Sequence, residues 1–164
     1  MNRAIRRAAK FKRGQQATIH RHVDPTAGLR LLHNARPYEA GEMADEHLKT
    51  RAAYERLRDG QGDEEDFDRV GMMLNIGLVR AEDIGNGELL VQTMQKAQEA
   101  MARVKARYLR GLRFGFDADG LASVPEALDA YETIMDASSP AQMKAAIQEA
   151  YARISNGDVL EVPV

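Results

Sequence analysis

The chain has 164 residues and a mass of 18.2 kDa, with 44% hydrophobic and 29% charged residues and neither Cys nor Trp. This length suits one domain whose hydrophobic core is large enough to be stable without cross-links such as disulfides. The missing cysteines exclude a disulfide scaffold, a Cys-ligated metal site and a thiol nucleophile, and they favour a cytoplasmic location. No apolar stretch approaches the ~20 residues that cross a bilayer, and the start of the chain lacks the apolar core of a secretory signal, so no membrane association is expected.

Charge is unevenly distributed along the chain. The net charge is only −2, yet residues 1–36 carry nine Lys or Arg and a single acid, Asp24, which leaves 14 basic and 24 acidic residues for the remainder. Such asymmetry indicates a basic arm. We therefore predict a basic N-terminal arm and linker over residues 1–36, which could include a short helix at 3–13, a helical bundle domain over 37–157, and an extended C-terminal tail over 158–164.

Proline is absent from residues 38–124, which favours long helices there. The first predicted helix covers about 38–58 and ends before the break at residues 59–62. Asp63 is a good N-cap for a second helix, whose apolar stripe runs from Phe67 to Ala81. After the turn at residues 85–87 we predict a third helix over about 88–111.

The predicted helix over 88–111 carries the most regular apolar stripe of the chain. Its members recur alternately four and three residues apart: Leu90, Met94, Ala97, Met101, Val104 and Tyr108. This spacing is typical of a seam in a bundle or a coiled coil. Such a seam can be buried within one chain, or it can pair two subunits through Leu90, Met94, Met101, Val104 and Tyr108.

Two capping boxes predict the last helices. The sequence Ser123-Val-Pro-Glu126 combines an N-cap serine, a proline in the first turn and a glutamate three residues on, and Ser139-Pro-Ala-Gln142 repeats the pattern. The first box predicts a helix start near Val124, and the second predicts a helix that ends at Asn156-Gly157. We therefore expect an all-α fold of about five main helices in an antiparallel bundle.

Two sets of basic residues are candidates for binding an anionic partner. The arm supplies Arg3, Arg6, Arg7, Lys10, Lys12 and Arg13, and one face of the helix over 88–111, opposite the seam, supplies Arg103, Arg107 and Arg110. Clusters of this kind bind phosphates through charge and counterion release. The arm could instead pair with the acidic stretch between Glu39 and Asp68, or dock a protein. No helix-turn-helix, RNP or zinc-finger spacing appears, so sequence-specific DNA recognition is not expected.

Catalytic and metal-binding motifs are missing from the sequence. No nucleophile elbow, P-loop, zincin or dinucleotide-binding motif occurs. Asp117-Ala-Asp119-Gly120 with Glu126 only partly imitates a calcium loop, because Gly115 stands where the first ligand should be. His20-x-His22 lies beside arginines that oppose a cation. We predict no enzymatic activity, no metal and no cofactor.

Three segments carry a family resemblance. The opening Met-Asn-Arg-Ala-Ile-Arg-Arg-Ala-Ala-Lys resembles the openings of many small uncharacterised proteins in prophages of Gram-negative bacteria. Residues 71–82 and 113–117 are similar to one such helical group. The resemblance implies an accessory phage or prophage protein, and it carries no catalytic residues over to this chain.

The sequence thus supports two expectations about function. In the first, the chain is a non-enzymatic interaction protein that binds a protein partner or a second copy of itself through bundle faces, with the basic arm as an electrostatic handle. In the second, it is a nucleic-acid-binding accessory or regulatory protein that uses the arm and the face from Arg103 to Arg113.

Overall fold

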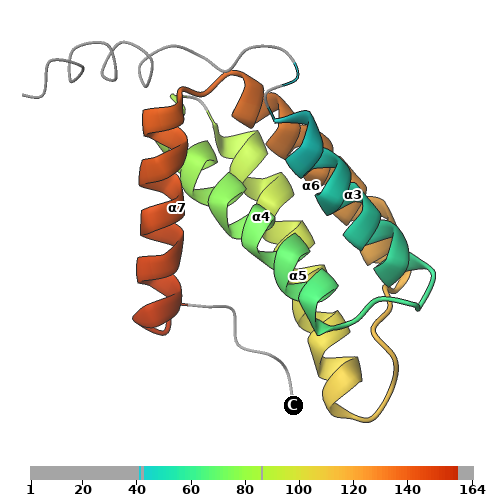
Figure 1. Cartoon of the computed structure of the whole chain (residues 1–164). Helices are drawn as coiled ribbons and strands as arrows, with labels where there is room; N and C mark the ends of the chain where they lie inside the picture. Colours follow the sequence, from blue (N-terminus) through green and yellow to red (C-terminus); the bar gives the residue numbers. More distant parts are fainter. Residues whose placement is uncertain (1–40, 42, 86, 159–164) are drawn as a thin grey trace, which may run out of the picture. The chain divides into compact units, whose positions relative to one another are not determined.

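The computed structural model describes residues 41, 43–85 and 87–158, all of which belong to one compact unit. The predicted arm over 1–36 lies outside the described residues, as does the predicted tail apart from Asp158. The described part is entirely α-helical apart from its turns and loops, which confirms the predicted fold class (Figure 1). Its helices are α3 (Ala44–Arg58), α4 (Glu64–Asp83), α5 (Glu88–Leu109), α6 (Ala118–Asp136) and α7 (Pro140–Ser155).

Helix α4 is the centre of the bundle. It packs against α3, α5, α6 and α7, while α6 also packs against α5 and, more lightly, α3. Consecutive helices run in opposite directions, as short connections require (Figure 1). Helix α7 differs from the others because it packs chiefly against α4, so it lies outside the four helices α3 to α6.

The core is formed where these four helices meet. Its largest fully buried side chains come from each of them: Leu57, Val70, Leu74, Met94, Val104, Val124, Leu128 and Met135. Close packing is visible at Gly77 of α4, where an added Cβ would lie 2.9 Å from the sulfur of Met94. A glycine at this position therefore lets α5 approach α4 closely.

Both N-caps predicted for α4 and α7 are present. Asp63 accepts a hydrogen bond from the Asp66 amide at 3.0 Å, and the Asp66 carboxylate accepts one from the Asp63 amide. Ser139 and Gln142 form the same reciprocal box at the start of α7. Each box satisfies two backbone donors that the first turn of a helix leaves without partners.

The start of α6 differs from the prediction. The helix begins at Ala118, and Asp117 is its N-cap because its carboxylate accepts the Gly120 amide at 2.8 Å. Ser123 and Pro125 therefore lie inside α6, and the hydroxyl of Ser123 is buried with no hydrogen-bond partner in the described part of the chain. The first helix also begins later than expected, at Ala44.

The seam of α5 is largely internal. Met94, Met101 and Val104 are at most 4% exposed, because they pack into the core of their own chain. Only the two ends of the seam reach solvent: Leu90 is partly buried and Tyr108 is 40% exposed. Because its central residues are already covered, the seam does not form a self-association surface in this fold, and that prediction is corrected.

Candidate partner-binding surface

Arg103 was predicted to face an anionic partner, but it is engaged within the chain. Its Nε donates a hydrogen bond of 2.7 Å to Asp117, and its Nη2 lies 3.9 Å from Asp119. The guanidinium lowers the pKa of Asp117, mainly through this hydrogen bond. Arg103 therefore holds the first turn of α6, and its role in binding an anionic partner stays a prediction.

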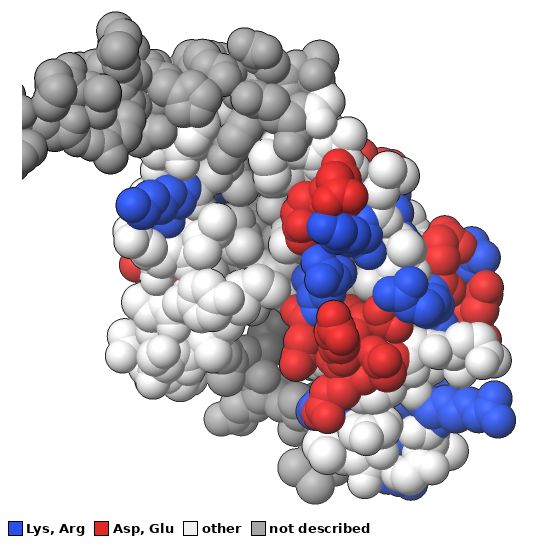
Figure 2. Space-filling view, viewed as in Figure 1, with Lys and Arg blue, Asp and Glu red and all other residues white. Residues whose placement is uncertain are grey.

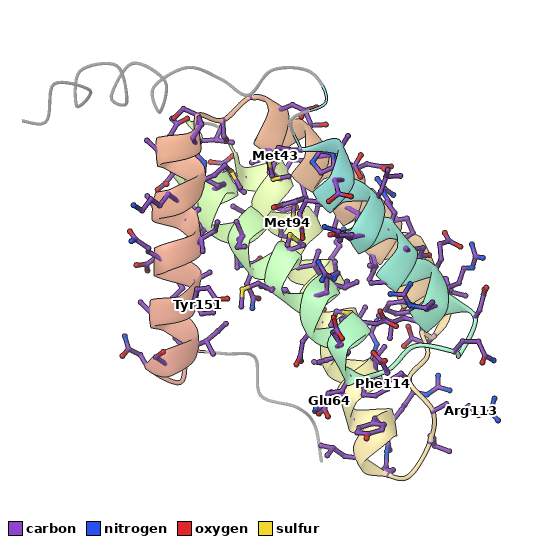
Figure 3. All side chains as sticks on the ribbon, in the orientation of Figure 1. Met43, Glu64, Met94, Arg113, Phe114 and Tyr151 are labelled. Atoms are coloured by element: carbon purple, nitrogen blue, oxygen red, sulfur yellow. The ribbon has the colours of Figure 1, made fainter. Side chains whose placement is uncertain are left out.

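The remaining arginines of this face lie at one end of the bundle. Arg107, Arg110 and the loop residue Arg113 form no ion pair with an acid among the described residues, and Arg113 extends away from the loop in Figure 3. We call these three the arginine tip. Exposed Leu109 and Leu112 accompany it. The arm residues predicted to act with this face (Arg3, Arg6, Arg7, Lys10, Lys12 and Arg13) lie outside the described residues.

Helix α7 is attached to α4 by a narrow stripe. Met143, Ala146 and Ala150 are the buried residues of α7, and two of them are small. A paired contact strengthens the attachment near the end of the helix, where the guanidinium of Arg153 donates to both carboxylate oxygens of Glu82 at 2.7 and 3.2 Å. Among the helices that the structure describes, α7 packs chiefly against α4, so this contact leaves both flanks of α7 open to other partners.

Large apolar side chains stand exposed along α7. Ile147 is 37% exposed, Tyr151 is 56% exposed and Ile154 is 39% exposed. Their spacing of four and three residues sets them along one side of a helix. We call these three residues the α7 ridge. Apolar groups that gather on a surface in this way are typical of interaction sites.

A groove lies between α7 and α5 over the surface of α4. Its volume is about 920 Å³. Apolar lining comes from all three helices, including Phe67 and Leu78 of α4, Met101 of α5 and Ile154 of α7. Figure 2 shows a hollow between α7 and the other helices, with acidic side chains gathered beside it over the N-terminal part of α4. We call this hollow the α5/α7 groove.

The charges that line the groove are not balanced. Its two cations already have partners: Lys105 lies 3.2 Å from Glu64, and Arg153 pairs with Glu82. Its other acids, Asp68, Glu99 and Asp158, form no ion pair in the described part of the chain. The groove therefore presents free carboxylates around an apolar floor.

A smaller hollow lies on the other flank of α7. It has a volume of about 280 Å³ and is lined by five methionines together with residues that include Ile147 and Tyr151 of the ridge. The methionines are Met43, Met72, Met73, Met135 and Met143. Methionine is flexible and polarizable, so surfaces rich in it adapt to differently shaped partners. We call this region the methionine hollow.

The carboxylates with lowered pKa values do not line either hollow. The pKa of Asp66 is lowered mainly by its hydrogen bonds from Arg56, and the pKa of Asp117 is lowered mainly by Arg103. Both acids cap or complete the first turn of a helix. Their shifts thus follow from structural ion pairs, and neither marks a reactive group in a pocket.

Neither a metal-ligand cluster nor a membrane-spanning helix occurs among the described residues. No group of three or more His, Asp or Glu side chains there is placed to hold a metal ion. The residues that imitate a calcium loop, from Asp117 to Glu126, instead form the N-cap and first turns of α6. None of the helices in the described ranges combines the length and apolar character that crossing a bilayer demands.

The chain matches no protein-family model, no curated protein and no solved structure. Its candidate surface therefore has to be judged from its own residues. Sequence reasoning did not find the groove or the ridge. The spacing of Ile147, Tyr151 and Ile154 is visible in the sequence, but a core stripe has the same spacing, and only the packing of α7 on α4 separates the two cases.

Proposed function

We propose that this chain is a non-enzymatic accessory protein of phage or prophage type that acts by binding a protein partner through the surface around α7. The observation that carries the proposal is the exposure of the α7 ridge between two hollows. Ile147, Tyr151 and Ile154 offer apolar area at the surface, and the hollows on either flank offer concave sites for partner side chains. The phage or prophage setting rests on the resemblance of the opening residues and of 71–82 and 113–117.

The charge pattern and the attachment of α7 also support this function. Net negative charge over the described residues, opposite to that of the arm over 1–36, favours charge-guided encounters with a partner. A peripheral helix with few neighbours can adjust its position when a partner binds. The other walls of the two hollows belong chiefly to α4, α5 and α6 of the four-helix core.

The test compares a ridge variant with a matched surface variant. The full chain, tagged and produced in its native host, is captured with its partners as wild type, as Tyr151→Ser/Ile154→Ser, and as Leu89→Ser/Leu121→Ser. The control leucines are exposed on α5 and α6, and neither lines the groove or the methionine hollow. We expect the same partner to be retained by wild type and control and lost from the ridge variant. Retention by all three proteins, or a wild-type monomer without any partner, contradicts the proposal.

A second candidate function is binding of nucleic acid through the arginine tip. It is favoured by the absence of acidic partners for Arg107, Arg110 and Arg113 among the described residues, and by Tyr108, which stacks on Phe114 with ring centroids 4.0 Å apart and stays 40% exposed beside them. In fluorescence anisotropy with labelled DNA and RNA, substituting Gln at all three positions should weaken binding at roughly 50 mM salt and flatten its salt dependence. Equal binding by wild type and this variant would show that the arginine tip is not a nucleic-acid-binding site.

A further inference from the structure

We propose that the α5/α7 groove binds one amphipathic helix of a partner protein, with an apolar side facing the groove floor and basic residues along its edges. This inference rests on the proposed function and specifies the chemistry of the partner. It concerns the groove alone and makes no use of the methionine hollow.

The position and size of the groove fit a helix. Helices α5 and α7 both lie against α4 and flank the groove, so an added helix would occupy the position on α4 between them. A helix is about 10 Å wide with its side chains and rises about 5.4 Å per turn, so two turns enclose roughly 850 Å³. The groove volume is about 920 Å³.

The floor of the groove offers an apolar surface with room above the backbone. Phe67, Leu78 and Met101 contribute apolar side chains to it. Gly71 lies among them, and a Cβ added at this glycine would meet no atom within 4 Å. An apolar side chain of a bound helix can therefore approach α4 closely at Gly71, as side chains do in helix-in-groove recognition.

The charges of the rim favour a basic helix over an acidic one. Asp68 of α4, Glu99 of α5 and Asp158 after α7 lie on different walls and carry no ion pair in the described ranges. Lys105 and Arg153 are already neutralised by Glu64 and Glu82. Lysines or arginines flanking an apolar stripe would pair with the free carboxylates, whereas an acidic helix would be repelled by them.

The experiment uses three synthetic peptides and the full chain. The first is a fluorescein-labelled peptide of about 14 residues, or four turns, with Leu at amphipathic-helix spacing and Lys elsewhere. The second has Glu in place of every Lys, and the third has a central Pro that breaks the helix. We expect the Lys peptide to bind at least about tenfold more tightly than either of the others.

Two groove variants and two matched controls locate the binding. Gly71→Leu fills the groove and should weaken binding of the Lys peptide about tenfold, and Asp68→Asn/Glu99→Gln should weaken it about fivefold. Ala145→Leu adds an exposed leucine elsewhere on α7, and Glu126→Gln/Asp136→Asn removes the same charge from α6. Both controls should bind like wild type. Circular dichroism and thermal unfolding check that every variant is folded.

Several results would overturn the proposal. Equal binding of the Lys and Glu peptides removes the charge argument, equal binding of the Pro peptide points to an extended segment, and unchanged binding by Gly71→Leu places the peptide elsewhere. A concentration-dependent dimer that Gly71→Leu abolishes would make a second copy the occupant. If the peptides fail while partner retention still depends on Tyr151 and Ile154, the proposed function stands and only the partner chemistry is wrong.

Discussion

Arg103 of α5 and Asp117, the N-cap of α6, are joined by a hydrogen bond of 2.7 Å between Nε and Oδ2. The other carboxylate oxygen of Asp117 accepts the Gly120 amide at 2.8 Å. One side chain thus links the end of the α5–α6 loop to α5 while it caps α6. This contact explains why α6 begins at Ala118 and shows that Arg103 is held against the start of α6.

Replacing Asp117 should therefore destabilise the bundle. Asp117→Ala removes the N-cap and leaves Arg103 without its closest partner, so the free energy of unfolding should fall by about 1 kcal/mol, within the usual range for lost caps. Urea unfolding followed by circular dichroism measures this change. Asp119→Ala is the control. Asp119 is 87% exposed, and its carboxylate comes no nearer to the Arg103 guanidinium than 3.9 Å, so it contributes little to the contact. An equal loss in both variants would argue against a specific cap at Asp117.

Ser123→Ala tests the start of α6 by removing the other candidate N-cap. If Ser123 capped α6, its removal would cost about 1 kcal/mol. In the structure its hydroxyl is buried within the helix and has no partner among the described residues, so alanine removes an unsatisfied polar group and should leave stability unchanged or raise it by up to about 1 kcal/mol. A clear loss on urea unfolding would place the start of α6 at the capping box instead.

Two glycines of α4 should respond oppositely to alanine. Gly71→Ala places a methyl group in open space and should raise the free energy of unfolding by about 0.5–1 kcal/mol, because alanine is the better helix former. At Gly77 the same methyl group would lie 2.9 Å from Met94, which is fully buried, and 3.1 Å from Tyr131. Gly77→Ala should therefore be less stable than Gly71→Ala by at least about 1 kcal/mol. Equal thermal stability of the two variants would contradict the close approach of α5 and α6 to α4.

Acid should weaken the fold partly through Asp66. Its pKa is lowered in the folded state, mainly by hydrogen bonds from Arg56, so its contribution is complete above the ordinary value of about 3.9. That contribution is lost as the pH falls through the lower folded-state pKa. Asp66→Asn should therefore be less stable than wild type at pH 7, and the difference should shrink under strongly acidic conditions. A difference in the free energy of unfolding that stays constant across this range would contradict the ion pair.

Local sequence signals predicted most of the helices but could not decide between competing signals. The boxes at Asp63 and Ser139 involve neighbours three residues apart, and both are present. The box at Ser123 has an equally good local pattern, yet Asp117 is the N-cap of α6. Asp117 also accepts a hydrogen bond from Arg103, which lies on the preceding helix, and a pattern of neighbouring residues does not contain this contact. The spacing of the α5 seam predicted an apolar face correctly, but spacing alone does not distinguish a partner helix of the same chain from one of a second copy.

The candidate surface depends on packing that no local pattern encodes. Ala146 and Ala150 are buried, whereas Ile147 and Tyr151 stay exposed, although all four have helical spacing. The carboxylates of Asp68 and Glu99 line a groove only because α7 and α5 leave a gap between them over α4. Such relationships follow from how helices far apart in the sequence meet, so they required the structure.

The most direct test of the central claim is site-specific photo-cross-linking of the full chain in its native host. A photoreactive amino acid replaces Tyr151 on the α7 ridge in one protein and the exposed Leu121 of α6 in another. We predict a discrete cross-linked protein from position 151 and none from position 121. No adduct at position 151, or the same adducts at both positions, would contradict a partner-binding surface around α7.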